Sequence, residues 1–269
     1  MKTPPTPTPS PNPSGIIGQR EYDQYVANWV AAASDPTGTE LAQSFRLGKN
    51  HPQLLSQVSF PALQIARLVS TVGAVSIKAR FLIIHDDHKQ PHFTVALFAT
   101  DSLDARLSSY YLAHEYWKQP AQPYAAAAAD AAEASAAASA RPQPVPAVAP
   151  ARTEVPSVLA SFWLNRWGAL TQVAPALFAT TYGPLRGYTY GVDEFVFPLR
   201  QLGNSNWEAL KHENLLLEFD LHEYYRTEPQ GEVLVHTFGM LLRLASIKLS
   251  AGTGGGGGVN MGGPCPPTC

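Results

Sequence analysis

The residues of this chain best suited to bind a metal ion lie in one short segment, His85-Asp86-Asp87-His88, with His92 shortly after it. Imidazole and carboxylate groups together suit zinc or another first-row ion. If the segment is the turn of a β-hairpin, both arms of the hairpin can present ligands to one ion, and His85, Asp87, His88 and His92 form the candidate zinc site. Because hairpin turns favour Asp for backbone reasons alone, a solvated polar turn is the competing interpretation.

Thiol chemistry rests on the only two cysteines, Cys265 and Cys269, which follow a glycine run that begins at Gly254. A flexible glycine tether with a stiff proline-rich tip is suited to reach a partner, and exposed thiols there can oxidise, bind a soft metal or form a tether. The competing interpretation is a disordered tail whose cysteines have no role. Since no other cysteine offers a disulfide framework, we expect a cytoplasmic protein.

The sequence carries little trace of catalysis. It has no Gly-x-Ser-x-Gly motif, no phosphate-binding glycine loop and no His-Glu-x-x-His motif. Glu218 and Asp220 share one face of a predicted strand, where a carboxylate pair can act as acid and base. The alternative is the solvated face of a half-exposed strand, so we expect a non-enzymatic protein.

The elements that must position these residues occur twice along the chain. A helix ending in Trp29 recurs as one ending in Trp167, and an apolar run after each leads to a hairpin. The other matched anchors are Phe60-Pro61 with Phe197-Pro198 and Ile84-His85-Asp86 with Leu221-His222-Glu223, and the step from Pro to His is 24 residues in both halves. We interpret this as a tandem duplication of a helix-helix-β-hairpin module.

Hydrophobic periodicity places these elements and predicts an α+β fold. In the first half we expect helices over 21–33 and 53–72 and a hairpin of strands 75–84 and 92–100. The second half repeats the plan with a helix over 157–170, a helical or irregular region over 198–212, and strands near 214–222 and 232–245.

A lone two-stranded hairpin is marginally stable, so something must cover each hairpin edge. We expect the two hairpins to join in one four-stranded antiparallel sheet with the helices on one face. The alternative adds a strand to each half, at 108–116 or 188–197, and makes two independent domains. A small-ligand site between the halves, lined by Trp163 and Trp167, is a further candidate. Clustered tyrosines such as Tyr224-Tyr225 are core residues or an interaction surface.

Composition divides the chain into five parts. These are a disordered Pro-rich tail (1–19), the first α+β repeat (20–118), an Ala/Pro-rich linker (119–156), the second repeat (157–250) and a Gly-rich tail ending in Cys-Pro-Pro-Thr-Cys (251–269). The net charge is −2 and no basic stripe exists, which argues against a nucleic-acid partner. We also expect no transmembrane segment and no signal peptide.

The Cys-Pro-Pro-x-Cys ending, the Trp-bearing helix and the Ile77-Lys78-Ala79-Arg80-Phe81 strand with its hairpin resemble a loosely related set of small, uncharacterised bacterial proteins. The resemblance covers the first half and the last residues. It implies a bacterial cytosolic origin and brings no activity, cofactor or site residue. Three hypotheses follow: an interaction or scaffold protein that binds a protein partner or itself, a metal-binding or redox-active protein, and a small-ligand binder.

Overall fold

The computed structural model describes residues 15–47, 53–118, 154–201, 207–228, 231–245, 259–261 and 263–264. Most of the expected N-terminal tail, the linker up to residue 153 and both cysteines lie outside these ranges. Within these ranges the predicted α+β class is confirmed, because the structure contains both helices and antiparallel sheets.

The described helices are α1 (Gln19–Ser34), α2 (Thr39–Ser44), α3 (Ala62–Val69), α4 (Ser157–Gly168), α5 (Val192–Gln201) and α6 (Trp207–His212), with short 3₁₀ helices η1 (Tyr116–Lys118) and η2 (Pro175–Phe178). The described strands are β1 (Ile16–Ile17), β2 (Gln57–Pro61), β3 (Ser76–His85), β4 (Pro91–Thr100), β5 (Tyr110–Leu112), β6 (Glu154–Val155), β7 (Ala179–Thr180), β8 (Gly183–Pro184), β9 (Gly187–Gly191), β10 (Asn214–Glu228), β11 (Gly231–Leu244), β12 (Val259–Met261) and β13 (Gly263–Pro264).

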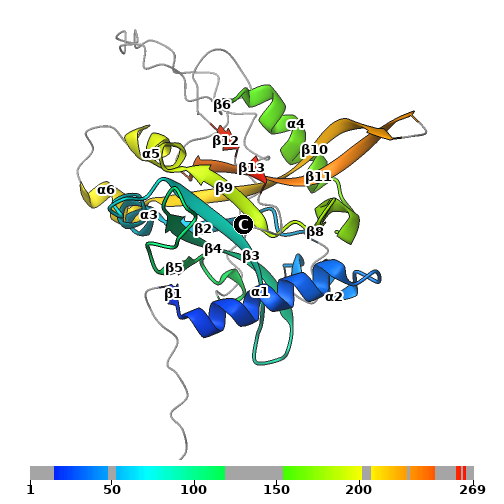
Figure 1. Cartoon of the computed structure of the whole chain (residues 1–269), viewed down its shortest axis with the longest axis horizontal. Helices are drawn as coiled ribbons and strands as arrows, with labels where there is room; N and C mark the ends of the chain where they lie inside the picture. Colours follow the sequence, from blue (N-terminus) through cyan, green and yellow to red (C-terminus); the bar gives the residue numbers. More distant parts are fainter. Residues whose placement is uncertain are drawn as a thin grey trace, which may run out of the picture.

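The two long hairpins lie in different sheets, so the expected single four-stranded sheet is wrong. One sheet has the order β1-β5-β4-β3-β9-β13 and the other the order β2-β10-β11-β12-β6 (Figure 1). Each hairpin finds its edge partners among short strands, which is why it does not need the other hairpin.

The halves exchange strands, so two independent domains are also ruled out. Strand β2 of the first half pairs with β10 of the second, and β9 of the second half pairs with β3 of the first. The two exchanged strands pair in equivalent registers. Val58 of β2 lies opposite Leu217 of β10, and Tyr188 of β9 lies opposite Ala79 of β3. Each hairpin therefore depends on the other half for a strand.

The same symmetry recurs in single hydrogen bonds. The indole nitrogen of Trp29 donates to the carbonyl of Leu185 at 2.9 Å, and that of Trp167 donates to the carbonyl of Leu55 at 3.0 Å. Both acceptors lie just before the exchanged strands β9 and β2. The repeat is therefore visible in three dimensions, while its origin by duplication stays a prediction.

One pair of segments that the sequence repeat matches does not occupy equivalent places in the structure. Phe60-Pro61 ends β2 before α3, and the residues in the matching place are Tyr190-Gly191 at the end of β9 before α5. Phe197-Pro198 lies inside α5 instead. Strand β9 begins just before the alternative segment 188–197, and an exchanged strand so short leaves a weak periodic signal.

The central core lies between the two sheets and is rich in aromatic rings. Trp29 packs against Phe81 and Phe178 with centroids 5.1 and 5.0 Å apart, and Trp167 packs against Phe238 at 5.1 Å. All of these side chains are fully buried. Both halves thus share one core.

Each sheet is also covered on its outer face. Helix α1 lies along β3, where Tyr22 joins an outer cluster with Leu82 and Tyr110, and α4 lies along β10 with Ala160 against Leu241 (Figure 1). Alternation along β3 places Lys78 and Arg80 on the face opposite Ile77, Ala79 and Phe81. Both are buried there, since α1 covers that face.

The Gly-rich tail contributes strands, which a free tether would not. Strand β12 pairs with β11 and β6, and β13 pairs with β9. The contacts of β12 repeat those of β5 with β4 and β1 in the first half. Residues 259–261 therefore occupy the place beside the long hairpin that Tyr110–Leu112 occupy in the first repeat.

Candidate interaction surface

The second hairpin is longer than the first and projects from the body of the molecule. Strands β10 and β11 have 15 and 14 residues, against 10 in each of β3 and β4. Figure 1 shows its tip far from the helices α3, α5 and α6 at the opposite end. We call residues 224–228 and 231–235 the arm.

Apolar side chains of the arm are exposed to solvent on both faces. Tyr225 is 70% exposed and forms a cross-strand pair with Leu234, which is 43% exposed. Tyr224 and Val233 lie together on the opposite face of the arm and are 47% and 41% exposed. Tyrosine gives a large contact area at a small loss of side-chain entropy, so this surface is chemically suited to a protein contact.

The strand edges of the arm are also open among the described residues. On one side, β2 pairs with β10 only as far as Glu218; on the other, β12 pairs with β11 only at Leu241 and Leu242. Beyond these points the two arm strands pair only with each other in the described structure. Free backbone N–H and C=O groups on such an edge are a template for a further strand.

The base of the arm is fixed to α4 by charge. The carboxylate of Glu223 contacts the guanidinium of Arg166 and lies 2.6 Å from Nε2 of His236 on the neighbouring strand. Arg166 directly precedes the buried Trp167. These contacts connect the base of the arm to α4 and, through the neighbouring Trp167, to the core.

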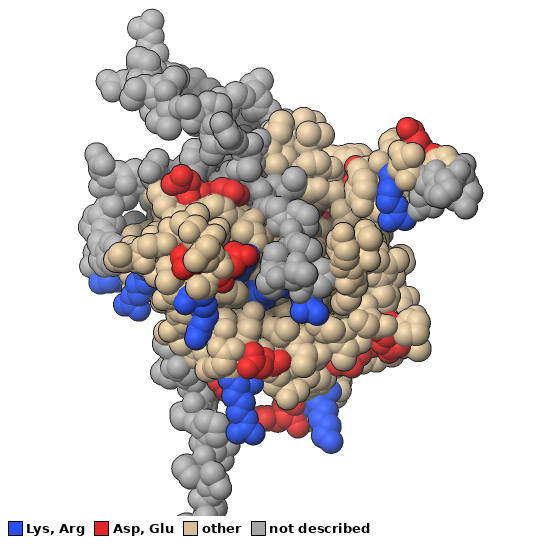
Figure 2. All heavy atoms as spheres, in the orientation of Figure 1, with Lys and Arg blue, Asp and Glu red and all other residues tan. Residues whose placement is uncertain are grey.

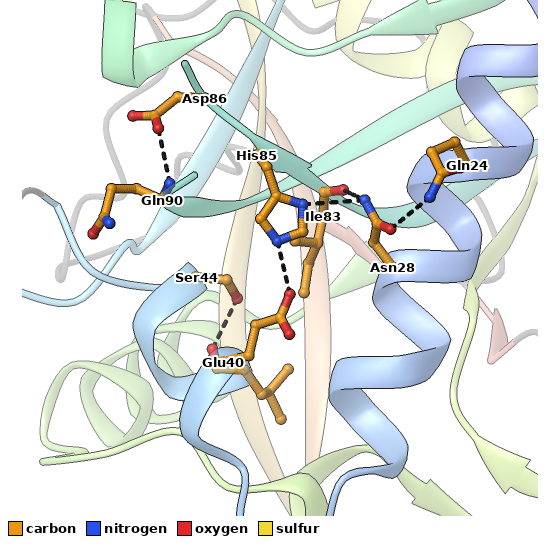
Figure 3. Close-up of polar contacts among 9 residues, drawn as sticks. Gln24, Asn28, Glu40, Ser44, Ile83, His85, Asp86 and Gln90 are labelled. Carbon is orange, nitrogen blue, oxygen red and sulfur yellow. Dashed lines mark hydrogen bonds and ion pairs between the residues drawn. The ribbon is translucent and has the colours of Figure 1, made fainter. Parts of the chain in front are cut away.

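The matching position in the first half is His85, which was a candidate metal ligand. Its Nε2 lies 2.9 Å from Glu40 Oε1, and its Nδ1 lies 3.3 Å from the side-chain amide of Asn28, the residue before Trp29 (Figure 3). The amide of Asn28 also donates to the carbonyl of Ile83 at 3.0 Å. His85 therefore joins α1 and α2 to the hairpin.

The four predicted metal ligands are not brought together. His85 and His92 come from neighbouring cross-strand pairs, His85 with Pro91 and Ile84 with His92, so they point to opposite faces. His92 lies 3.2 Å from Asp86 and stacks on Trp117, while Asp87 and His88 lie in the turn. Among the described residues, no three His, Cys, Asp or Glu side chains could hold an ion.

The two tryptophans proposed to line a ligand site have other places. Trp167 is fully buried in the shared core. Trp163 lies over the outer face of the second sheet and stacks on the imidazole of His222 with centroids 4.2 Å apart. Among the described residues, Trp167 packs against aromatic rings of the shared core, among them Phe45, Phe219 and Phe238.

The two strand carboxylates are both buried, which corrects the expectation of a solvated face. Glu218 is held by two hydrogen bonds from Arg243, at 2.8 and 2.5 Å. Asp220 is fully buried with Oδ1 2.5 Å from Nε2 of His222, and burial raises the pKa of Asp220 while His222 opposes the shift. An alanine Cβ at Gly239 would overlap both Asp220 and His222.

Sequence reasoning missed the length of the arm and Gly239. A signal for the first was present: the turn-forming residues Thr227-Glu228-Pro229-Gln230-Gly231 lie several residues beyond the predicted end of the strand at 222. Tyr224-Tyr225 fills that gap and is a candidate interaction surface from sequence, whereas nothing in the sequence singles out Val233 and Leu234. No local pattern marks Gly239, because its role depends on its cross-strand neighbour.

Charge is dispersed on the face that Figure 2 shows, where basic and acidic side chains alternate without a large patch of one sign. No described helix is both long enough and apolar enough to cross a membrane. Searches of protein-family models, curated proteins and solved structures found no significant match to this chain.

Proposed function

We propose that this is a non-enzymatic interaction protein whose arm makes the contact, and that its first partner is a second copy of the chain. The observation that carries the proposal is the exposed apolar arm, with Tyr225 and Leu234 paired on a projecting ribbon. Exposed apolar surface of this kind is uncommon on a monomer without a binding role.

A second copy fits the arm because the arm is self-complementary. It offers an open strand edge and exposed apolar faces, and an identical arm can pair with the edge and cover the apolar side chains. Two arms related by a two-fold axis then cover each other, in the isologous arrangement most common among oligomers. The arm also carries both charge signs, with Arg226 and Glu232, so two copies do not meet as like-charged surfaces.

The test compares matched exposed residues by sedimentation velocity over a concentration series. The variant Tyr225→Ser/Leu234→Ser removes the arm surface, and the control Tyr182→Ser/Leu103→Ser removes side chains that are 77% and 87% exposed elsewhere. We expect a dimer for the wild type and the control and a monomer for the arm variant. An arm variant that associates as tightly as the wild type would contradict the proposal.

A further inference from the structure

Helices α1 and α4 occupy equivalent places in the two repeats, so one helix serves as an internal comparison for the other. Trp29 and Trp167 donate equivalent indole hydrogen bonds. Seven residues before each of them, Tyr22 and Ala160 are buried in the outer cluster of their own sheet. The side chains three and four residues before each tryptophan are partly buried against the same clusters. The two helices therefore match residue by residue, with Trp29 aligned on Trp167.

The exposed faces of the two helices differ in chemistry. On α1 the exposed positions nine, eight and five residues before the tryptophan hold Arg20, Glu21 and Gln24. The same positions of α4 hold Val158, Leu159 and Phe162, which are 73%, 43% and 49% exposed. We call these three residues the α4 stripe, since their spacing places them on one face of the helix. Because α1 packs in the same way with polar residues there, the fold does not require apolar side chains at these positions.

The α4 stripe continues into the base of the arm. The guanidinium carbon of Arg166, one turn after Phe162, lies over the Phe162 ring at 5.1 Å from its centroid. The same guanidinium contacts the carboxylate of Glu223. Two residues further along the hairpin, on the same face as Glu223, is the exposed pair Tyr225 and Leu234. Figure 1 shows α4 beside the base of the arm, so the stripe and this face of the arm form one surface.

Exposed apolar area on this surface approaches what a stable dimer needs. Seven of the twelve large apolar side chains that are exposed in the described part of the chain belong to α4 or the arm. A homodimer interface buries about 800 Å² per partner, of which about 500 Å² is apolar. Tyr225 and Leu234 offer only about 200 Å², taking roughly 200 Å² for a fully exposed aromatic side chain and about 150 Å² for an aliphatic one. The α4 stripe adds about 250 Å² on the same basis.

The symmetry of a dimer brings a partner arm toward the stripe. When identical strand edges pair about a two-fold axis, the paired strands run antiparallel. The tip of each arm then reaches the base of the other arm, where Arg166 joins α4 to Glu223. Both copies make this contact at the same time, so one added surface is used twice.

We propose that the α4 stripe is the second part of the interface between two copies of this chain, and that it is covered by the arm of the partner copy. The inference rests on the proposed self-association through the arm, and it adds the surface that receives the arm. It explains why α4 exposes valine, leucine and phenylalanine where α1 exposes arginine, glutamate and glutamine.

Sedimentation velocity of the full chain tests the stripe by giving α4 the residues of α1. The variant Val158→Arg/Leu159→Glu/Phe162→Gln introduces the side chains that the equivalent helix carries at these positions. The control Val72→Arg/Leu103→Glu makes the same change of charge at side chains that are 93% and 87% exposed elsewhere. We expect the stripe variant to associate about 100-fold more weakly than the wild type, because apolar contact residues are lost, and the control to associate unchanged.

The arm variant Tyr225→Ser/Leu234→Ser, measured in the same series, separates this inference from the proposed function. A wild type that is monomeric at every concentration overturns both. A monomeric arm variant beside a stripe variant that associates as tightly as the wild type leaves association through the arm standing and overturns the contact with α4.

Photo-crosslinking identifies what covers the stripe and keeps its apolar character. Phe162 is replaced by p-benzoylphenylalanine, and unlabelled chains are mixed with isotope-labelled chains before illumination. We expect crosslinked peptides that join an unlabelled chain to a labelled one, with the second peptide coming from the arm. Crosslinks confined to one chain, such as to residues 119–153, or crosslinks to another part of the partner overturn the proposal. This test applies even if the triple variant of the stripe does not fold.

Discussion

The buried carboxylate under α4 determines how one part of the molecule responds to pH. Asp220 has no exposure to solvent, and its nearest partner is the imidazole of His222 beneath Trp163. Burial raises the pKa of Asp220, His222 opposes this, and the neighbouring Glu218 adds to it. The folded protein therefore takes up this proton more readily than the unfolded chain does.

The variant Asp220→Asn should lose part of the pH dependence of stability. A carboxyl whose folded pKa is raised contributes its stability below the unfolded pKa, and that contribution is lost as pH rises through the folded pKa. The free energy of unfolding of the wild type should thus decrease across this window, and that of the variant should decrease less. Urea unfolding at a series of pH values from about 4 to 7 measures both slopes. Equal slopes would mean that the pKa of Asp220 is the same in the folded and unfolded states, which would contradict the upward shift caused by burial.

A methyl group at position 239 should destabilise the protein. Gly239→Ala places a Cβ into Asp220 Oδ1 and His222 Nε2, and overpacking of this kind reduces the free energy of unfolding by about 1–3 kcal/mol. Gly168→Ala is the control, because nothing lies within 4 Å of a Cβ there. Unfolding in urea compares the two. A Gly239→Ala variant as stable as the control would show that the Asp220–His222 pair moves aside freely.

At the scale of elements, two indole hydrogen bonds tie the Trp-bearing helices to the exchanged strands. Trp29→Phe and Trp167→Phe each leave a buried carbonyl, of Leu185 or Leu55, without its donor. We expect each variant to lose about 1–3 kcal/mol of stability, and the two losses to be similar. Trp163→Phe is the comparison and should lose less stability. Trp163 is only partly buried, and the phenyl ring of the variant can still stack on His222.

Chemical denaturation of the three variants gives these differences directly. A loss confined to one of the two core tryptophans would contradict the equivalence of the two helices. If Trp163→Phe lost more stability than either Trp29→Phe or Trp167→Phe, the contact that contributes most to the docking of α4 would lie on the outer face of the sheet.

The hairpins could be predicted from the sequence, but their partners could not. The alternation of Ile77, Ala79 and Phe81 with polar residues indicates a strand, and β3 and β4 lie within a residue of the predicted bounds. Which strand fills an open edge depends on contacts far along the chain, so the exchange of β2 and β9 left no local pattern. The same holds for β12 and β13, since glycine-rich segments have low strand propensity.

The candidate site was predictable only in part for the same reason. Tyr224-Tyr225 is visible as an aromatic pair, yet its exposure depends on how far the hairpin extends past the core. His85 was expected to bind a metal because residue type and turn position fit. The structure instead places it against Glu40 and Asn28, from helices that sequence spacing did not connect to the turn.

At the scale of the whole molecule, the exchange of strands makes each half incomplete. Of two fragments cut between residues 119 and 153, the first lacks strands β9 and β13 of its sheet, the second lacks strand β2, and each lacks part of the shared aromatic core. We expect neither fragment to unfold cooperatively alone, and we expect the mixture to recover the circular dichroism and the cooperative melt of the intact chain. A single fragment that folds by itself would contradict the shared core.

The most direct test of the central claim, contact through the arm, is native mass spectrometry of the intact chain beside the Tyr225→Ser/Leu234→Ser variant, each measured through a dilution series. We predict a wild-type mass of twice the 29.0 kDa chain that shifts to the single mass on dilution, and a variant that has the single mass throughout. Equal dimer populations in both proteins would place the contact away from the arm. A wild-type chain that has only the single mass at every concentration would contradict self-association.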